Sequence, residues 1–492
     1  MADPAPASLP PKRPLRQDGV LKADLCIIGA GSGGLSVAAG AVQMGASVVL
    51  IEKGEMGGDC LNTGCVPSKA LIAAAHAAHA VRDGQRFGVH AAEPEIRFEE
   101  VHAHVHGVIG AIAPHDSVER FEQLGVHVIK AAARFLDRDK VEAGGETIAA
   151  RRFVIATGSR AAVPPIPGLP DAGYLTNESV FELQERPEHL IVVGGGPIGI
   201  EMAQSFRRLG SRVTVIEKFG ILARDEPEAV EVVRAALVRD GVTLLEQVGI
   251  SEVRRDGAVV TVTLDGDSAV GRSVAGSHLL VAAGRRPNVE NLGLDAAGVS
   301  FTPKGITVDA RLLTSNRRIF AIGDVSGGPQ FTHIAGYHAG IVIRNALFGL
   351  PAKVDYTALP WVTYADPELA HAGLTEAEAR KGGHDVQILT WSFAVNDRAQ
   401  AERATEGLAK VVLGRKGRIL GATIVGPRAG ELIGTWALAI SSRLRIGAVA
   451  SAVLPYPTLS EISKRAAGSY YTPKLFGSTT RRVVGFVQRF LR

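Results

Sequence analysis

Two stretches of the chain repeat one pattern of hydrophobic and polar positions. Residues 23–54 and 189–220 each begin with an apolar run typical of a buried strand, pass through a glycine-rich turn and a helical segment, and end on a second apolar run. This order predicts a βαβ unit in each stretch, with parallel strands covered by a helix. Two such units in one chain of 492 residues predict an α/β protein with two Rossmann-like domains.

Three glycines interrupt each unit at the same spacing. The first set is Gly29, Gly31 and Gly34, and the second is Gly194, Gly196 and Gly199. Each unit ends on a glutamate, Glu52 or Glu217, 23 residues after its first glycine. Such glycines allow a tight turn and let backbone N–H groups approach a pyrophosphate, while the acid binds ribose hydroxyls. The sequence therefore predicts two dinucleotide sites.

The acid at the end of the second unit bears on which nicotinamide cofactor is used. A carboxylate at Glu217 would repel a 2′-phosphate, which favours NADH over NADPH. Lys218 and the pair Arg207 and Arg208 lie close in the sequence and weaken this preference, so NADP(H) stays an alternative.

The pattern changes after about residue 351. Residues 410–426 place two apolar runs around a basic turn that contains glycine, which predicts an antiparallel hairpin. Residues 429–444 have apolar positions at helical spacing, which predicts a helix with one buried face. We therefore expect a third domain built on an antiparallel sheet.

Composition narrows the class of protein. The formal net charge is only +4, so no nucleic-acid partner is expected. Three cysteines are too few for a secreted disulfide scaffold, and no run of about 18 apolar residues is present that could span a membrane. The first 20 residues, rich in proline and small residues, predict a disordered leader instead of a signal peptide, and hence a cytoplasmic protein.

Two of the three cysteines, Cys60 and Cys65, lie in the segment GGDCLNTGCVPSK. A structural disulfide is disfavoured in a reducing compartment. A zinc site would need more ligands, and the nearby His76 and His79 are spaced more closely than zinc-finger histidines.

A reactive pair of thiols fits the local pattern best. Cys65 begins a strong helical pattern with Pro67 in its first turn, and Lys69 follows one turn later. The positive end of a helix and a nearby lysine both lower the pKa of a thiol. The third cysteine, Cys26, lies within an apolar strand, where packing is the expected role.

Seven motifs along residues 23–471 resemble those of the class I pyridine nucleotide–disulfide oxidoreductases, the family of dihydrolipoamide dehydrogenase, glutathione reductase and mercuric reductase. They are IIGAGSGG, GGDCLNTGCVPSK, IATGSR, VVGGGPIGIE, VAAGRRPN, FAIGDV and PTLSE. The resemblance implies one Rossmann-like domain for FAD, one for NAD(P) and a C-terminal α+β dimerisation domain. It also implies a homodimer in which the third domain completes each active site across the two-fold axis.

The resemblance assigns residues to both cofactors. For FAD it implies Gly29, Gly31, Gly34, Glu52, Lys69, Gly158, Asp324 and His333. For NAD(H) it implies Gly194, Gly196, Gly199, Glu217 and Gly284. Asp324 would bond the ribityl chain, and His333 would begin a helix at the pyrimidine end of the flavin.

The resemblance also implies how electrons move. Cys65 would be the thiolate that contacts the flavin, and Cys60 would be the distal interchange thiol. Lys69 would lie near the flavin N5, paired with Glu201. Hydride would pass from NADH to the flavin, and electrons would then reach a Cys60–Cys65 disulfide.

The chain departs from the disulfide-reducing members near its C-terminus. Those members have His-Pro-Thr followed by Glu, with the histidine as general acid and base, whereas here Tyr456 precedes Pro457 and Glu461 is retained. Tyrosine, with a pKa of about 10, is a poor base at neutral pH. Mercuric reductases also place tyrosine here, but they add a C-terminal cysteine pair, and this sequence has no cysteine after Cys65. Slow Hg(II) turnover is therefore expected.

The function predicted from the sequence is an FAD-dependent NAD(P)H oxidoreductase with a metal ion, a disulfide or a quinone as acceptor. Dihydrolipoamide dehydrogenase activity is the alternative, disfavoured by Tyr456. An alternative from another class is a flavoprotein scaffold whose cysteines only sense redox state.

A second group of histidines, His102, His104 and His106, invites a metal site. Alternate positions on a helix are spread around it, so the sequence predicts no metal ligands here.

The C-terminal end is basic, with no Asp or Glu after Glu461. Apolar residues at helical spacing predict an amphipathic helix that rests on an anionic membrane, docks on the dimer or is solvated. The predicted divisions are a leader (1–20), an FAD-binding domain (21–165 and 286–352), an NAD(P)-binding domain (166–285), a dimerisation domain (353–472) and a tail (473–492).

Overall fold

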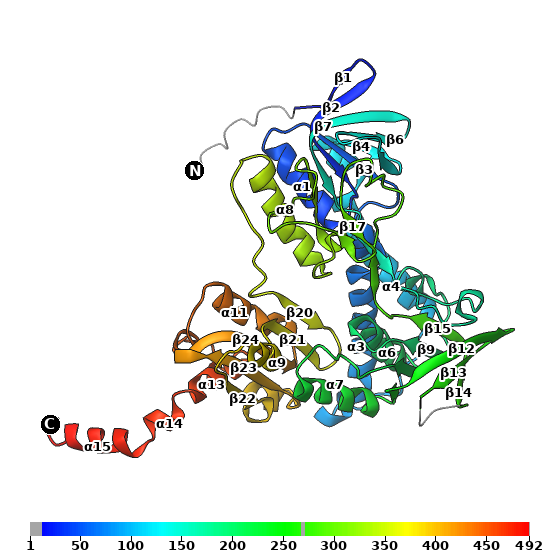
Figure 1. Cartoon of the computed structure of the whole chain (residues 1–492). Coiled ribbons are helices and arrows are strands. Elements are labelled where there is room, and N and C mark those ends of the chain that lie inside the picture. The colour runs from blue at the N-terminus through cyan, green and yellow to red at the C-terminus, as the bar shows by residue number, and fades with distance from the viewer. Residues whose placement is uncertain (1–11, 267–270, 492) are drawn as a thin grey trace, which may run out of the picture. The chain divides into compact units, whose positions relative to one another are not determined.

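The computed structural model describes residues 12–266 and 271–491 (Figure 1). The chain divides into two compact units, one formed by residues 1–186 and 278–354, the other by residues 187–277 and 355–492. The three-domain boundaries predicted from the sequence stay a prediction. The two units are described separately, as unit 1 and unit 2.

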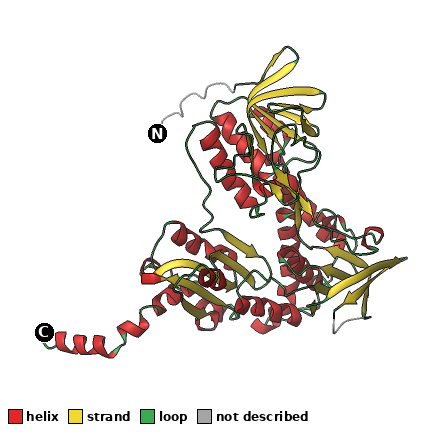
Figure 2. Cartoon of the chain, viewed as in Figure 1, coloured by secondary structure: helices red, strands yellow, loops and turns green. Residues whose placement is uncertain are grey.

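Unit 1 is an α/β domain around a mixed sheet (Figures 1 and 2). Its main strands are β1 (Leu15–Gln17), β2 (Val20–Ile28), β3 (Val48–Glu52), β4 (His127–Lys130), β5 (Ala133–Phe135), β6 (Lys140–Ala143), β7 (Glu146–Ile155) and β19 (Ile319–Ala321). Unit 1 also contains the short strands β8 (Ser159–Ala161), β15 (His278–Val281), β16 (Arg285–Pro287), β17 (Phe301–Thr302) and β18 (Gly305–Ile306), which lie outside this sheet. Its helices are α1 (Ser32–Gln43), α2 (Gly58–Asn62), α3 (Cys65–Asp83), α4 (Phe98–Ile112), α5 (Val118–Gln123) and α8 (Thr332–Ala346).

The strand order is β4-β3-β2-β7-β6-β5, with β19 beside β7. Strands β4, β3, β2, β7 and β19 are parallel to one another, whereas β6 pairs antiparallel with both of its neighbours, β7 and β5. The central strand β2 has both faces buried. Leu25 and Ile27 pack with α1 and α8 on one face, while Cys26 and Ile28 pack with β5–β7 on the other.

The prediction that residues 1–20 form a disordered leader was wrong for the C-terminal part of that segment. Leu15–Gln17 form β1, which pairs antiparallel with the start of β2. The ladder of backbone hydrogen bonds outweighs the polar composition of this segment. Residues 1–11 lie outside the described residues.

Unit 2 contains the second glycine-rich βαβ unit and the C-terminal sheet. Its strands are β9 (His189–Val193), β10 (Arg212–Glu217), β11 (Thr243–Glu246), β12 (Gly249–Asp256), β13 (Val259–Asp265), β14 (Ser273–Gly276), β20 (Pro360–Thr363), β21 (Glu368–Gly373), β22 (Gln387–Ser392), β23 (Leu408–Gly414) and β24 (Arg418–Gly426). Its helices are α6 (Pro197–Arg208), α7 (Pro227–Arg239), α9 (Glu376–Lys381), α10 (Asp397–Ala401), α11 (Ala429–Ser441), α12 (Ile446–Ala450), α13 (Glu461–Ser469), α14 (Thr472–Leu475) and α15 (Ser478–Val487).

The C-terminal sheet confirms the predicted hairpin and helix. Five antiparallel strands follow the order β20-β21-β24-β23-β22, and β23 and β24 form the hairpin around residues 415–417. Trp436 of α11 is fully buried against this sheet, and its indole N–H donates to Ser463 Oγ of α13 at 3.0 Å. Among the described residues, no helix is both long and apolar enough to cross a bilayer.

Candidate active site

The two glycine-rich turns have the same local geometry. Gly29 and Gly194 both have a left-handed φ, +106° and +113°, which disfavours a side chain. A Cβ on Gly34 would lie 1.8 Å from Gly29 O, and a Cβ on Gly199 would lie 2.0 Å from Gly194 O. These glycines therefore let each helix start directly against the end of its strand.

The acid at the end of each βαβ unit is bonded to its own turn. Glu52 accepts from the backbone N–H of residue 30 at 2.6 Å and of residue 54 at 2.7 Å. Glu217 accepts from the backbone N–H of residue 195 at 2.6 Å and of residue 219 at 2.9 Å. The matching bonds place one carboxylate beside each glycine turn.

The helix that follows each turn begins without a cap. Neither α1 nor α6 has a side-chain cap or an acidic residue in its first turn, so the positive end of each helix is left for an anion. This is the arrangement that a pyrophosphate requires, and both turns fit a dinucleotide.

The cysteine pair lies where α2 meets α3 in unit 1. Cys65 is the first residue of α3, whose N-cap is Gly64, and it is exposed, while Cys60 in α2 is half-buried. Both cysteines are free thiols, and the Sγ atom of Cys65 lies 3.4 Å from Thr332 Oγ1 at the start of α8.

A hydrogen bond between the two cysteines separates their pKa values. This bond, together with Thr332 and the charge of Lys69, lowers the pKa of Cys65 to about 6. The same bond, followed by burial, raises the pKa of Cys60 above its usual range. At neutral pH the pair is therefore one thiolate and one thiol. Cys26 is fully buried, and burial raises its pKa.

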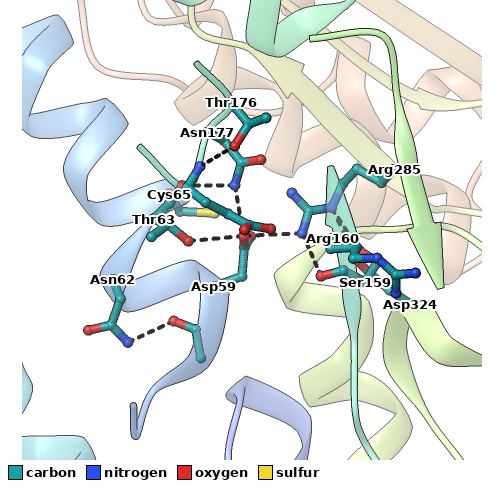
Figure 3. Close-up of polar contacts among 12 residues, drawn as sticks. Asp59, Asn62, Thr63, Cys65, Ser159, Arg160, Thr176, Asn177, Arg285 and Asp324 are labelled. Carbon is teal, nitrogen blue, oxygen red and sulfur yellow. Dashed lines mark hydrogen bonds and ion pairs between the residues drawn. The ribbon is translucent and has the colours of Figure 1, made fainter. Parts of the chain in front are cut away.

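The residue before Cys60, Asp59, fixes the position of α2. Its Oδ1 accepts from Asn177 Nδ2 at 2.9 Å and from Thr63 Oγ1 at 3.2 Å (Figure 3). Asn177 is buried and also donates to Thr63 O at 3.1 Å. The cysteine-bearing helix is thus held by the segment around Asn177.

A second contact links Asp59 to Asp324. Arg285 lies 3.1 Å from Asp59 Oδ1 and donates from Nε to Ser159 Oγ at 2.8 Å (Figure 3). Ser159 in turn donates to Asp324 Oδ2 at 2.5 Å. Burial raises the pKa of Asp324, while the hydroxyl and the guanidinium oppose this rise. The network joins the cysteine segment to the aspartate predicted to bond FAD.

The other residues predicted for FAD also lie in unit 1. Lys69 begins the second turn of α3, and Gly158 has φ +66° in the turn between β7 and β8. His333 is exposed on α8 and stacks on Phe331. Gly284, predicted for NAD(H), lies in this unit, and its carbonyl accepts from Ala162 N at 2.9 Å.

Glu201, Tyr456 and Glu461 belong to unit 2. Glu201 is buried on α6 and accepts from the backbone N–H of Tyr364 at 3.0 Å. Its pairing with Lys69 stays a prediction. Glu461 is the first residue of α13.

The tyrosine at the usual histidine position has a partner. Tyr456 is 68% exposed, and its hydroxyl donates to Asp397 Oδ2 at 2.8 Å. This hydrogen bond, with the charge of Asp397, raises the pKa of Tyr456 further above its ordinary value. The phenol therefore stays protonated at neutral pH.

Sequence reasoning missed five residues of the site. They are Asp59, Ser159, Asn177, Arg285 and Thr332. Asp59, Ser159 and Arg285 stand inside recognised motifs, so a closer reading of those motifs could have found them. Asn177 and Thr332 carry no sequence signal, because only the fold brings them to the cysteines.

The fold and the site define a class of protein, a flavin- and nicotinamide-dependent oxidoreductase with a cysteine pair. The chain matches the family model "Pyridine nucleotide-disulphide oxidoreductase" over residues 23–339 and the dimerisation-domain model of that family over residues 359–467. It belongs to this family, whose members use FAD and NAD(P)H, and the predicted family, fold class and enzyme class are confirmed. The dimerisation-domain match supports the predicted homodimer.

Curated relatives include two differently named enzymes. The chain is 38% identical to a mercuric reductase from Streptomyces lividans, covering 91% of this chain and 96% of the relative. It is 36% identical to a dihydrolipoyl dehydrogenase from Geobacillus stearothermophilus, covering 92% and 96%.

Solved structures include two similar flavoproteins. LpdA from Mycobacterium tuberculosis has a TM-score of 0.83 at 27% identity, covering 91% of this chain and 99% of LpdA. The Cu(II) complex of the HOCl-induced flavoprotein disulfide reductase RclA from Escherichia coli has a TM-score of 0.81 at 28% identity, covering 90% and 98%.

Replacing Cys60 should change the pKa of its neighbour. In the dithiothreitol-reduced enzyme, alkylation of Cys65 by iodoacetamide should accelerate as pH rises through about 6. In Cys60→Ala the thiol donor is lost, so the midpoint should move to higher pH. Mass spectrometry of Cys65 labelling against pH measures both curves, and identical midpoints would contradict the assigned hydrogen bond.

Replacing Asn177 should loosen the anchor of Asp59. Asn177→Ala removes two partly buried hydrogen bonds and should lower the free energy of unfolding by about 1–3 kcal/mol. Asn177→Asp should cost more, because it places a second carboxylate beside Asp59. Denaturant titration compares the two variants, and an Asp variant as stable as the Ala variant would argue against this contact.

Proposed function

We propose that the chain passes an electron pair from NADH to a Cys60–Cys65 disulfide, and from the resulting thiols to a metal ion. The single observation that carries the acceptor class is the Tyr456–Asp397 hydrogen bond, which keeps the phenol protonated. The mercuric reductase relatives and the Cu(II) complex of a structural neighbour support a metal acceptor. Quinones and disulfides are the alternative electron acceptors.

The residues of both turns would hold the cofactors. For FAD these are Gly29, Gly31, Gly34 and Glu52, with Lys69, Gly158, Asp324 and His333. For NAD(H) they are Gly194, Gly196, Gly199 and Glu217, with Gly284. Bound FAD supplies the chemistry of accepting a hydride and releasing an electron pair. Glu217 favours NADH, because its carboxylate would repel a 2′-phosphate.

The cysteines perform the next step. An electron pair and a proton convert the disulfide into one thiol and one thiolate, and the S–S bond breaks. The pKa values assign the proton, because Cys60 stays protonated and Cys65 is the anion at neutral pH. A thiolate is also the form that binds a soft metal ion.

Tyr456 acts as a hydrogen-bond donor in this proposal. Oxidation of a dithiol such as dihydrolipoamide needs a base to remove a proton, and a phenol bonded to a carboxylate is a poor one. Reduction of a metal ion needs no such base. Dihydrolipoamide dehydrogenase activity is therefore the second candidate, favoured only by the dihydrolipoyl dehydrogenase relative.

The proposal predicts a spectroscopic signature. Anaerobic titration of the FAD-loaded enzyme with NADH should produce a long-wavelength absorption band from the Cys65 thiolate beside the cofactor. Cys65→Ser should abolish the band, and Cys26→Ser, at a buried position away from the pair, is the matched control. A wild-type enzyme without the band would refute the proposed role of Cys65.

The acceptor class predicts a specific effect at residue 456. In an NADH-dependent acceptor screen, wild-type activity with lipoamide should be at least about 100-fold below that with Cu(II) or a quinone, the size of a lost general base. Tyr456→His should raise lipoamide activity, and Tyr456→Phe, which only removes the hydroxyl, should not. Equal rates with lipoamide and metal ions in wild type would contradict this assignment.

The C-terminal tail carries a further predicted partner. Apart from the half-buried Thr480, the residues of α15 are exposed, and they include apolar residues (Val483, Val484, Phe486 and Val487) and basic residues (Arg481 and Arg482). We infer that this helix lies on an anionic membrane surface. Its positive charge complements anionic lipids, and its apolar residues recur at helical spacing, so that they can face the bilayer. The predicted cytoplasmic location stays a prediction.

Vesicle sedimentation tests the tail. The full chain should bind phosphatidylserine-containing vesicles at low salt, with binding lost at high salt and in Arg481→Glu/Arg482→Glu. Arg239→Glu, which reverses the charge of one exposed arginine on α7, is the control for a charge reversal outside α15. Equal binding to neutral phosphatidylcholine vesicles, or none to either, would rule out an electrostatic membrane contact.

A further inference from the structure

Two histidines and a glutamate meet in unit 1, away from both cofactor turns in the sequence. His102 and His106 lie on α4, and Glu182 ends the short helical turn Val180–Glu182. One ligand atom from each side chain lies within 4.8 Å of the other two. Among the residues that the structure describes, this is the group of histidine, cysteine and acid side chains close enough to share a metal ion.

The two histidines point the same way because they are four residues apart. Their ring centroids are separated by 4.2 Å. The prediction that alternating histidines spread around the helix was right only for His104, which is exposed and outside the group. One helical turn separates His102 from His106, so those two share a face.

Glu182 and the chain before it approach the second histidine. His106 Nε2 lies 3.7 Å from Glu182 Oε1 and 3.3 Å from Phe181 O. The Glu182 side chain is 62% exposed, so it can change rotamer to bring its carboxylate onto an ion.

The first histidine provides the independent sign of a missing ligand. His102 Nε2 is buried and has no hydrogen-bond partner among the described residues. Buried polar atoms are nearly always satisfied, so such a nitrogen calls for a partner that the protein itself does not supply.

We propose that His102, His106 and Glu182 form a binding site for a divalent cation of the zinc type. Two imidazole nitrogens and one carboxylate oxygen are ligands that Zn²⁺ accepts, and water can fill the fourth tetrahedral position. The cysteine pair can also bind Zn²⁺ through sulfur, but the proposed site uses nitrogen and oxygen ligands from other elements of unit 1. The chain would hold this bound ion separately from a metal ion that it reduces.

The ion would join α4 to the segment that anchors the cysteines. Glu182 follows Asn177 by five residues, and Asn177 bonds Asp59 next to Cys60. A metal ion bound by Glu182 and the histidines of α4 would restrain the chain that follows Asn177. The site is therefore expected to stabilise unit 1.

The experiment measures Zn²⁺ binding to the FAD-loaded full chain by titration calorimetry. The background variant Cys60→Ser/Cys65→Ser removes the competing thiols. Into this background go His106→Ala or Glu182→Gln, at partly exposed positions where folding is expected to be retained. His104→Ala, on the same helix but outside the group, is the matched control.

The background protein should bind one Zn²⁺, and Co²⁺ in its place should give the visible absorption of tetrahedral coordination. His106→Ala and Glu182→Gln should weaken Zn²⁺ binding by at least about tenfold, while His104→Ala should not. Zn²⁺ should also raise the unfolding temperature of the background and His104→Ala proteins but not of His106→Ala. Absence of stoichiometric Zn²⁺ binding, or equal weakening by His104→Ala and His106→Ala, would overturn the proposal.

Discussion

The hydrogen bond between the Cys60 thiol and the Cys65 thiolate is the interaction on which the proposed chemistry depends. It is the largest of the effects that make the pKa values of the two sulfurs different. With it the pKa of Cys65 falls to about 6 while that of Cys60 rises. The start of α3 and Lys69 favour the anion in the same direction. The fold therefore holds one sulfur as an anion and the other as a hydrogen-bond donor.

Asp59 connects this pair to the rest of unit 1. Asn177 holds it from one side, and Arg285 joins it through Ser159 to Asp324. A cysteine pair that exchanges electrons with a bound cofactor has to keep a fixed position, because misplacement of reacting groups slows the chemistry. The same segment that carries Asn177 reaches the histidine group on α4, so the proposed cation and the redox pair would share one structural support.

Much of the fold could be predicted from the sequence, because the glycine-rich turns are local features and the same pattern occurs twice. Gly29 and Gly34 are required by backbone approach, and Gly194 and Gly199 repeat the requirement. The partners of the site residues that are distant in the sequence could not be predicted. Asn177 contacts Asp59 from 118 positions away, and Thr332 contacts Cys65 from 267 positions away. No periodic pattern in the sequence predicts either contact. The shared face of His102 and His106 was overlooked because the expected spread was judged for all three histidines together, whereas these two are one helical turn apart.

The most direct test of the central claim is to count thiols before and after reduction by NADH. The oxidised, FAD-loaded enzyme is treated under argon with excess NADH and no acceptor, and accessible cysteines are labelled with iodoacetamide and located by mass spectrometry. The account predicts that Cys65 is unlabelled before NADH and labelled after it, that the protonated Cys60 is labelled more slowly, and that buried Cys26 stays unlabelled in the native protein. Oxidation of NADH that leaves Cys65 equally labelled with and without NADH would contradict it.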